Sequence, residues 1–341
     1  MLAFVKYGTQ TFEAELRDIP RPEPGENDVL LSLAGCGVCG SDLHAYRAAA
    51  GYEWVKPPVT LGHEFAGTIV GTGGAVRHFK EGDRVAVVGI QGCGHCATCR
   101  AGDTNMCLDR KVIGLSMDGG MAAYAVVDAA YLVPIPDSVD LVMGALVEPI
   151  SVAAHAMSKT VIRPGDRVVV SGPGPIGLFC GLIATLSGAR VVMLGAGADA
   201  ETRLPLARQL GFDVVNVASD PLKAALNTAF SGAAPDLWVE ASGSPQAFTT
   251  AIEKVRRGGC LVIVGMYSQF FEWMPTVAVR AGLSLHFSYA SVSRDYHFAL
   301  NLMAEGAIDT APLANIFPLA EAEAAFQAAL SGQTIKPVLV P

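Results

Sequence analysis

The chain has 341 residues, of which 51% are hydrophobic and only 16% are charged, and its formal net charge is -8. This composition excludes a disordered protein, because disorder combines low hydrophobicity with high charge density, and it favours two globular domains with large cores. Acidic residues outnumber basic ones by 32 to 24 and no basic run interrupts the sequence. We therefore expect neither nucleic acid nor an anionic membrane surface as a partner.

The longest uncharged segment, Val168 to Ala189, raises the question of a membrane span. Gly172-Pro173-Gly174-Pro175 divides it into two pieces, each far shorter than the roughly 20 residues that a spanning helix needs. The N-terminus lacks a basic start followed by a long apolar stretch and a small-residue cleavage site. The sequence therefore predicts no membrane span and a cytoplasmic location.

The pattern of short apolar runs predicts an α/β protein with two kinds of domain. From residue 1 to about 150, β-rich runs such as Val29–Leu33 and Arg84–Val88 alternate with Gly- and Pro-rich turns, which indicates a mainly β domain. From about 160 to 290, strand-like runs alternate with helical stretches, which is typical of a doubly wound parallel sheet. These runs are Val168–Ser171, Val191–Leu194, Val214–Val217, Leu237–Glu240 and Leu261–Val264. Two further helices are expected in the tail, over Phe298–Glu305 and Leu319–Leu330.

Four of the eight cysteines are clustered within 15 residues, at Cys93, Cys96, Cys99 and Cys107. Four thiolates among turn-forming glycines suit a closed, tetrahedral, structural zinc site. An iron–sulfur cluster or a redox-active pair would also use cysteines, but zinc is the metal that a closed tetrathiolate site favours. His95 is expected to face solvent, because four sulfurs complete the shell. Cys180 and Cys260 lie alone in apolar surroundings and are expected in cores.

A second set of metal-binding residue types is spread over the first half of the chain. Cys36 and Cys39 precede Ser41, Asp42 and His44, and Gly62-His63-Glu64 follows about twenty residues later; Glu148 stands alone in an apolar stretch. Each residue taken singly has a structural explanation, as a buried thiol, a core histidine or an ion-pair partner. Together, one thiolate, one imidazole and one carboxylate leave a fourth zinc position open, as a catalytic site requires.

A glycine-rich loop follows the run Arg167–Ser171 and precedes an apolar helical stretch, Leu178–Leu186. In this strand–loop–helix context the G-x-G-x-x-G pattern predicts a dinucleotide site, with the pyrophosphate at the helix N-terminus. The loop residues expected to bind the cofactor are Gly172, Gly174, Pro175, Ile176 and Gly177.

The end of the next strand bears on the choice between NAD and NADP. An NAD-specific loop places Asp or Glu there to bind the ribose 2′-hydroxyl, whereas this chain has Gly195. Asp199 or Glu201 remains available for the ribose, and Arg203 for a 2′-phosphate. The sequence leaves both cofactors open and favours NADP.

Taken together, these motifs resemble the zinc-dependent medium-chain dehydrogenase/reductase family over essentially the whole chain. The likeness rests on the segment from Gly35 to Asp42, Gly62-His63-Glu64, the cysteine cluster, Asp118-Gly119-Gly120 with Ala123-Tyr124, and the glycine loop. The stretch from Val147 to Ala153 resembles the sorbitol and polyol dehydrogenase branch. The Arg-Tyr pair that sorbitol dehydrogenases carry near their substrate has its best match here in Ser288-Tyr289, which lacks the arginine.

The resemblance implies a GroES-like catalytic domain over 1–153 and 292–341, and a Rossmann domain over 154–291. It implies that Cys39, not Cys36, is the catalytic zinc ligand, with His63 and an acidic residue, Glu64 or Glu148. It assigns Ser41 and His44 to a proton relay and Asp42 to support of the site, and it implies a homodimer or homotetramer. Two zinc ions per chain are expected.

The function expected on these grounds is reversible oxidation of a secondary alcohol to a ketone with NAD(P), with a polyol or sugar alcohol as the expected substrate. Zinc is expected to acidify the hydroxyl, and the nicotinamide, held near Gly265 and Met266, to accept the hydride. A butanediol, threonine, aldose or simple secondary alcohol is an alternative substrate. Tyr46 and Trp54 are expected either to line the substrate pocket or to pack as aromatic residues on the surface. A cofactor-binding protein with only structural zinc is a further alternative.

Overall fold

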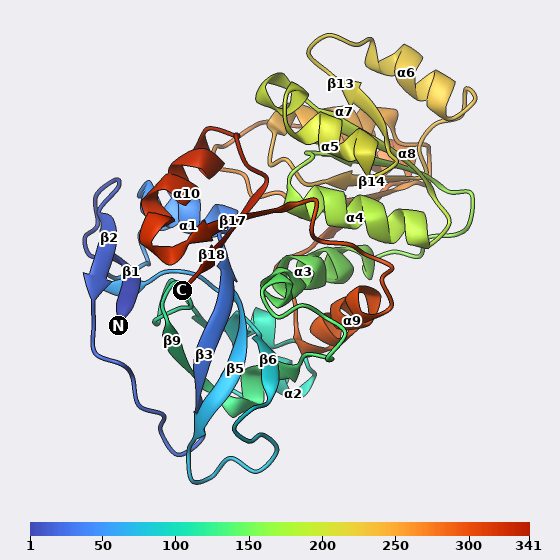
Figure 1. Cartoon of the computed structure of the whole chain (residues 1–341). Helices are drawn as coiled ribbons and strands as arrows, with labels where there is room; N and C mark the ends of the chain where they lie inside the picture. Colours follow the sequence, from blue (N-terminus) through green and yellow to red (C-terminus); the bar gives the residue numbers. More distant parts are fainter. The chain divides into compact units, whose positions relative to one another are not determined.

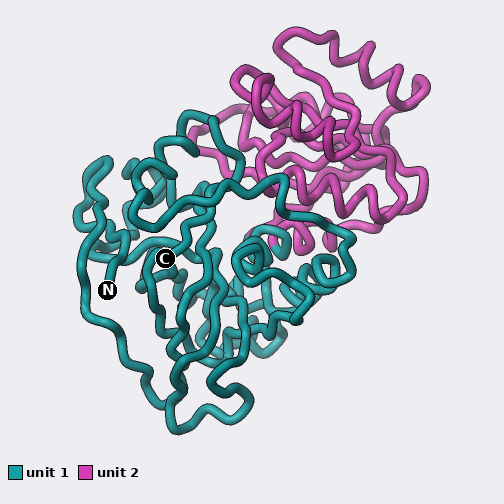
Figure 2. Tube along the Cα trace, viewed as in Figure 1, with its two compact units in different colours: residues 1–151, 290–341 teal, residues 152–289 magenta.

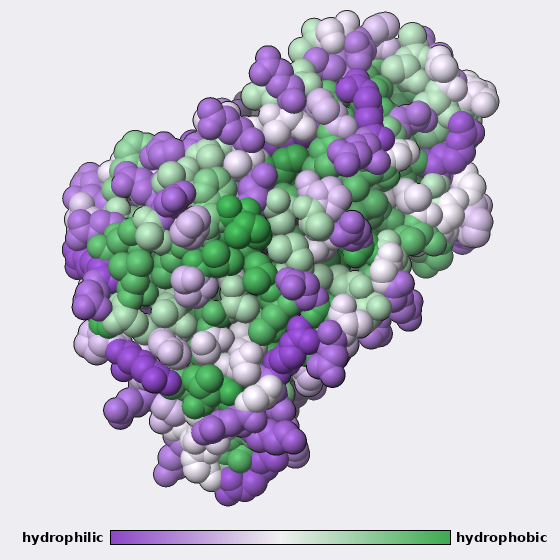
Figure 3. Space-filling view, in the orientation of Figure 1, coloured by the Kyte–Doolittle hydropathy of each residue, from purple (hydrophilic) through white to green (hydrophobic).

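The computed structural model describes residues 1–341, which divide into two compact units (Figure 2): unit 1 comprises Met1–Ser151 with Ala290–Pro341, and unit 2 comprises Val152–Tyr289. No helix is long and apolar enough to cross a membrane. On the face seen in Figure 3, hydrophilic residues are spread over both units around areas of apolar surface.

Unit 1 is a β structure to which the tail of the chain returns (Figure 1). Its strands are β1 (Leu2–Lys6), β2 (Ala14–Asp18), β3 (Asp28–Gly37), β4 (Val59–Thr60), β5 (Glu64–Thr72), β6 (Arg84–Val87), β7 (Ile90–Gln91), β8 (Lys111–Val112), β9 (Tyr124–Asp128), β10 (Leu132–Pro134), β17 (Ala314–Pro318) and β18 (Lys336–Val340). Its helices are α1 (Gly40–Tyr46), α2 (Ala97–Arg100), α9 (Ser293–Ala304) and α10 (Ala322–Leu330), and α3 (Val147–Met157) continues into unit 2. Short 3₁₀ helices are η1 (Thr104–Met106), η2 (Ala129–Tyr131), η3 (Met143–Leu146) and η5 (Leu319–Glu321).

The main sheet of unit 1 has the order β10-β6-β5-β3-β18-β17, and β9 also pairs with β3. The long strand β3 organises it, because Asp28 to Ser32 pair with β9 whereas Cys36 and Gly37 pair with β18. The last strand of the chain therefore lies beside the segment that leads into α1. Buried side chains of both parts form one core, which includes Phe4, Leu31, Phe65 and Phe326.

Unit 2 is a doubly wound sheet with six parallel strands in the order β13-β12-β11-β14-β15-β16. The strands are β11 (Arg167–Ser171), β12 (Arg190–Gly195), β13 (Asp213–Asn216), β14 (Leu237–Glu240), β15 (Cys260–Ile263) and β16 (Ser284–Phe287). The helices are α4 (Pro175–Leu186), α5 (Arg203–Gln209), α6 (Leu222–Ala229), α7 (Pro245–Lys254) and α8 (Pro275–Ala281), with a 3₁₀ turn η4 (Gly197–Ala200). The strand order reverses between β11 and β14, and ligands of such sheets bind at the carboxyl ends of the strands at this point.

The sequence prediction of an α/β fold with a β-rich and a Rossmann-type part is confirmed, and the five strands expected in unit 2 form within one residue of their expected bounds. Two expectations were incomplete. The tail helix expected at Phe298 begins five residues earlier, at Ser293, and the helix expected from Leu319 begins as the 3₁₀ turn η5 before α10. Strands β16, β17 and β18 were not expected, because their short runs lack a clear alternating pattern.

Candidate active site

The residues expected at the catalytic metal lie around the start of α1 and the start of β5. Cys39 is the N-cap of α1, and its backbone N–H donates to Asp42 Oδ2 at 2.9 Å. His63 and Glu64 come from the β4–β5 junction. The sulfur of Cys39, a ring nitrogen of His63 and a carboxylate oxygen of Glu64 lie within 4.8 Å of one another. Zinc bonds of about 2.0–2.3 Å separate tetrahedral ligand atoms by about 3.3–3.8 Å, so this donor set fits a zinc ion.

Unpartnered buried atoms around these residues support the same interpretation. Asp42 is fully buried, and its Oδ1 lies 3.5 Å from His63 Nδ1, yet neither atom makes a hydrogen bond. The other ring nitrogen, His63 Nε2, lies 3.3 Å from Ser41 Oγ. Burial lowers the pKa of His63, but Asp42 and Cys39 raise it more, so that its net pKa lies well above the usual value. The Asp42 carboxylate and the Cys39 sulfur thus surround this ring with groups that favour a positive charge.

A buried lysine that the sequence analysis did not identify, Lys336, compensates the negative charge of Glu64. Lys336, the first residue of β18, donates to Glu64 Oε1 at 2.6 Å and to Val38 O at 3.0 Å. Burial lowers the pKa of Lys336, and the Glu64 carboxylate then raises it above its ordinary value. Lys336 is the one charged residue in the apolar C-terminal segment, which is the only sequence feature that could have drawn attention to it. Its pairing with Glu64 could not be predicted, because 272 positions separate the two residues.

Glu148, at the start of α3, is not one of the three residues that lie together at the proposed metal site. It does interact electrostatically with one of them, Glu64. Burial raises the pKa of Glu148 to about 7, and the neighbouring Glu64 carboxylate raises it as well. Tyr296 of α9 is fully buried, and its hydroxyl accepts a hydrogen bond from Gly89 N at 3.1 Å. Ser151, one turn after Glu148, donates to Glu148 O at 2.6 Å and contacts Ser291 Oγ at 2.7 Å. These polar contacts hold the α3 segment in place.

His44, Tyr46 and Trp54, which were also expected near the substrate, lie in different surroundings. His44 lies three positions after Ser41 and therefore on the same side of α1; its ring stacks on Tyr52 at 5.2 Å between centroids. Burial, and then the Arg47 charge, lower the pKa of His44. Tyr46 is fully buried and packs against Phe4 and Phe326, so it is a core residue, and both expectations for it, pocket lining and surface packing, were wrong. Trp54 is exposed and donates to Gly51 O.

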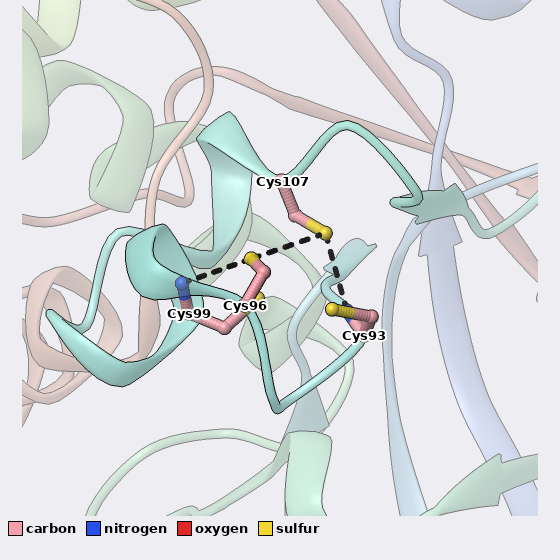
Figure 4. A group of neighbouring side chains, drawn as sticks. All are labelled: Cys93, Cys96, Cys99 and Cys107. Atoms are coloured by element: carbon pink, nitrogen blue, oxygen red, sulfur yellow. Dashed lines mark hydrogen bonds between the residues drawn. The ribbon is translucent and has the colours of Figure 1, made fainter.

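The four clustered cysteines form the second metal group, with their side-chain sulfurs within 4.8 Å of one another (Figure 4). Cys93 N lies 3.3 Å from Cys107 Sγ, and Cys99 N lies 3.4 Å from Cys96 Sγ, so backbone amides already face sulfur. A hydrogen bond with the Thr98 hydroxyl lowers the pKa of Cys96 to about 6. His95 is exposed, as expected. The set fits a closed tetrathiolate zinc site.

The glycine loop of unit 2 has the geometry of a phosphate-binding turn. Gly172 has a φ of +97°, and a Cβ on Gly177 would lie 1.9 Å from Gly172 O, so both positions require glycine. Gly174 has open space where a side chain would be, and no side chain caps the N-terminus of α4, whose first residue is Pro175. The free amides of Ile176 and Gly177 and the positive end of the helix can therefore take an anion.

At the end of β12, Asp199 and Arg203 form an ion pair beside Gly195. Asp199 Oδ1 lies 3.2 Å from Arg203 Nη1, and Asp199 Oδ2 accepts from Ala196 N at 3.1 Å. A Cβ on Gly195 would lie 3.0 Å from Asp199 Cβ. Arg203 Nε is buried without a hydrogen-bond partner. The Asp199 carboxylate is therefore neutralised by Arg203, and the Nε of Arg203 remains as a donor without an acceptor.

Comparison with known proteins agrees with this geometry. Residues 25–137 match the model of the alcohol dehydrogenase GroES-like domain, and residues 175–305 match that of the zinc-binding dehydrogenase family. A sorbitol dehydrogenase of Halalkalibacterium halodurans is 34% identical over the whole chain and 99% of its own length. An L-threonine 3-dehydrogenase of Chromobacterium violaceum is 32% identical over 95% of each chain. The solved structure of a zinc-binding dehydrogenase from Sinorhizobium meliloti bound to NADP has a TM-score of 0.92 at 28% identity and covers 100% of this chain and 99% of its own.

The chain therefore belongs to the zinc-dependent medium-chain dehydrogenase/reductase family. It is an oxidoreductase that acts on alcohols with a nicotinamide cofactor.

Proposed function

We propose that this protein oxidises a secondary alcohol of a polyol or sugar alcohol to a ketone, reversibly, with a zinc ion held by Cys39, His63 and an acidic residue. The observation that carries the proposal is the thiol, imidazole and carboxylate gathered within 4.8 Å, with buried Asp42 behind the imidazole. The similarity to a sorbitol dehydrogenase along the whole chain supports the polyol class. Glu64 is proposed as the resting ligand, and Glu148 as the residue that replaces it during turnover.

When bound, zinc lowers the pKa of the substrate hydroxyl and the nicotinamide accepts the hydride. The protein's own groups dispose of the proton. Ser41 Oγ, which lies 3.3 Å from His63 Nε2, would accept it, and His44, three residues further along α1, would pass it on. Burial and then the Arg47 charge lower the pKa of His44, which favours the neutral imidazole that a proton acceptor requires. Asp42 keeps the His63 ring oriented.

We propose a second zinc ion at Cys93, Cys96, Cys99 and Cys107 with a purely structural role. Four sulfurs complete its coordination and leave no position for a substrate. Arg294 of α9 forms an ion pair with Asp103 at 3.2 Å, which ties this cysteine lobe to the returning tail of unit 1.

The proposed cofactor is NADP. Gly195 contributes no side chain, and the carboxylate of Asp199 is already neutralised by Arg203, whose Nε lacks a partner. A 2′-phosphate would supply that partner. The NADP-bound relative supports the same choice. Arg203→Gln should weaken NADP binding about tenfold or more and leave NAD binding within twofold, and calorimetric titration of both cofactors tests it. Equal losses for the two cofactors would reject the assignment to the 2′-phosphate.

We further propose that the protein is a homodimer joined through unit 2. Strand β16 pairs with β15 on one side only, so its outer edge is open. Phe287 on β16 and Val279 on α8 are 68% and 77% exposed. Open edges and exposed apolar side chains are covered in stable proteins, and a second copy of the same edge is self-complementary about a twofold axis. Light scattering should give a dimer for the native chain and a monomer for Phe287→Lys; a native monomer would refute it.

Initial rates with both cofactors and a panel of polyols, diols, threonine, aldoses and simple secondary alcohols test the substrate assignment. A polyol should give the highest kcat/KM. Threonine is the second candidate, since a threonine dehydrogenase is similar over 95% of the chain. A clear preference for threonine would replace the polyol assignment without affecting the zinc assignment.

A further inference from the structure

The least expected group in unit 2 is Glu240, a fully buried carboxylate at the carboxyl end of β14. None of the ion pairs in the structure involves it. A buried carboxylate without a counter-charge is strongly disfavoured unless several hydrogen bonds replace its hydration. Because burial of this carboxylate costs desolvation free energy, we infer that its hydrogen bonds organise the surrounding backbone.

Four donors converge on the Glu240 carboxylate from two different segments. Oε1 accepts from the backbone N–H of Ser242 at 2.8 Å and from the Ser242 hydroxyl. Oε2 accepts from Gly243 N at 3.2 Å and from the Tyr267 hydroxyl at 2.6 Å. The backbone oxygen of Glu240 also accepts from Gly265 N at 2.9 Å. One residue thus ties the turn after β14, residues 241–244, to the segment after β15, residues 264–267.

The two segments are packed so tightly that only glycine fits where they meet. Gly243 has a φ of +66°, and a Cβ there would lie 2.3 Å from Met266 O. A Cβ on Gly265 would lie 2.6 Å from Glu240 Oε2, and one on Gly172 would lie 2.7 Å from Ser242 N. The pyrophosphate loop, the turn after β14 and the segment after β15 are therefore in direct contact at the carboxyl edge of the sheet.

Tyr267 is itself fixed by the apolar side of this edge. Its ring lies 5.3 Å from the ring of Phe271 and 6.3 Å from that of Phe248, which is buried. The hydroxyl therefore has little freedom to leave Glu240. Burial and the hydrogen bond to Glu240 both raise the pKa of Tyr267, which keeps the phenol protonated and donating.

A doubly wound sheet binds one nucleotide on each half, and β14 and β15 belong to the half that does not carry the glycine loop and the β12 ribose site. We propose that Glu240, with Tyr267, is a positioning residue for the nicotinamide half of the cofactor: its carboxylate holds residues 241–244 and 264–267 in the conformation that binds. This inference rests on the proposed use of a dinucleotide cofactor.

Glu240→Gln and Tyr267→Phe test the proposal in the zinc-loaded protein. The amide of glutamine replaces one acceptor by a donor that faces N–H and O–H groups, and phenylalanine removes one donor while keeping the ring. By titration calorimetry, the Kd of the dinucleotide preferred by the native protein should rise about tenfold or more in Glu240→Gln and about threefold or more in Tyr267→Phe. The Kd of the adenosine half alone, 2′,5′-ADP or 5′-AMP, should stay within twofold.

A matched control comes from the opposite end of the same strand. Asp236 precedes β14 and forms ion pairs with Arg167 at 2.7 Å and Arg256 at 2.6 Å. Asp236→Asn should lower the Tm but leave the dinucleotide Kd unchanged. Amide hydrogen exchange of residues 241–244 and 264–267 without cofactor should be faster in Tyr267→Phe than in the native protein and unchanged in the control.

Three outcomes would overturn the inference. Unchanged dinucleotide affinity in both variants would show that the segments hold their conformation without Glu240. Equal weakening of the dinucleotide and of the adenosine half, or weakening in Asp236→Asn in proportion to its Tm, would show a general loss of stability. If the native protein bound no dinucleotide, both the proposed function and this inference would be wrong. If Glu240→Gln did not fold, the dinucleotide affinity of Tyr267→Phe would test the inference instead.

Discussion

Removal of the Lys336 charge should destabilise unit 1, and the size of the loss should depend on the metal. Lys336 and Glu64 are only 3% and 1% exposed, and their charged atoms are 2.5–2.6 Å apart. Loss of one partner from a buried pair costs about 3–5 kcal/mol, because the other charge stays buried without compensation. For a domain of roughly 200 residues this corresponds to a fall in Tm of about 6–20 °C in Lys336→Met.

A double-mutant cycle isolates the interaction. Replacement of both charges, in Glu64→Gln with Lys336→Met, should recover much of the loss, since an apolar substitute for a buried pair is often neutral. If Glu64 faces the metal, the zinc charge compensates the carboxylate in part, and the loss in Lys336→Met should be smaller in zinc-loaded than in chelated protein. Lys6→Met is a matched control, because Lys6 is equally buried but donates to the Gln10 carbonyl.

The assay is urea denaturation followed by circular dichroism, with and without a chelator. Coupling between Glu64 and Lys336 should be about 2 kcal/mol or more, whereas Lys6→Met and Glu64→Gln should be additive. Additive effects at Glu64 and Lys336 would refute the buried pair. A loss in Lys336→Met that is the same with and without zinc would refute the placement of Glu64 at the metal.

Three further predictions concern charge and metal content. The pKa of Asp236 is held below its ordinary value of 3.8, chiefly by the Arg167 guanidinium, so the pair stabilises fully above about pH 4 and less as the pH falls toward the folded-state pKa. Asp236→Asn should therefore cost about 1–3 kcal/mol at pH 7 and less at pH 3 in denaturant titrations; a pH-independent difference would contradict the ion pair. The pKa of His44 is lowered by burial and by Arg47, so Arg47→Gln should raise it and move the acidic limb of kcat/KM for alcohol oxidation to higher pH; an unmoved limb would remove His44 from the relay. Cys99→Ser should reduce the zinc content measured by mass spectrometry by one ion per chain and lower the Tm, while zinc at the Cys39 group remains; loss of both ions would show that the two sites are not independent.

The sequence predicted those parts of the fold that depend on local pattern. Strands β11 to β15 have apolar, Val-rich centres and are separated by helices, and the glycine loop follows β11 directly, so each could be located from its neighbours. Residue spacing likewise pointed to the four cysteines and to the segment from Cys36 to His44, whereas the choice of Cys39 over Cys36 came from the family resemblance. These features are short range, and their chemistry is specific.

The rest depends on contacts between distant parts of the chain. Lys336 meets Glu64 only because β18 pairs with β3, and Tyr296 meets Gly89 because the tail returns to unit 1. Glu240 gave no signal beyond a charge at the end of an apolar strand, since its partners come from the two turns that follow β14 and β15. Tyr46 was expected in a pocket or on the surface, because its core contact with Phe326 joins residues 280 positions apart.

Catalysis should require a metal at Cys39, His63 and an acidic residue, and zinc content and turnover of Cys39→Ser beside the native protein test this requirement. The native protein should contain about two zinc ions per chain, and a chelator should abolish its alcohol oxidation. Cys39→Ser should keep one zinc ion, bind the cofactor normally and lose turnover by at least about a thousandfold. Full turnover by Cys39→Ser with one zinc ion per chain would contradict a catalytic metal at Cys39 and leave a dehydrogenase whose zinc is only structural.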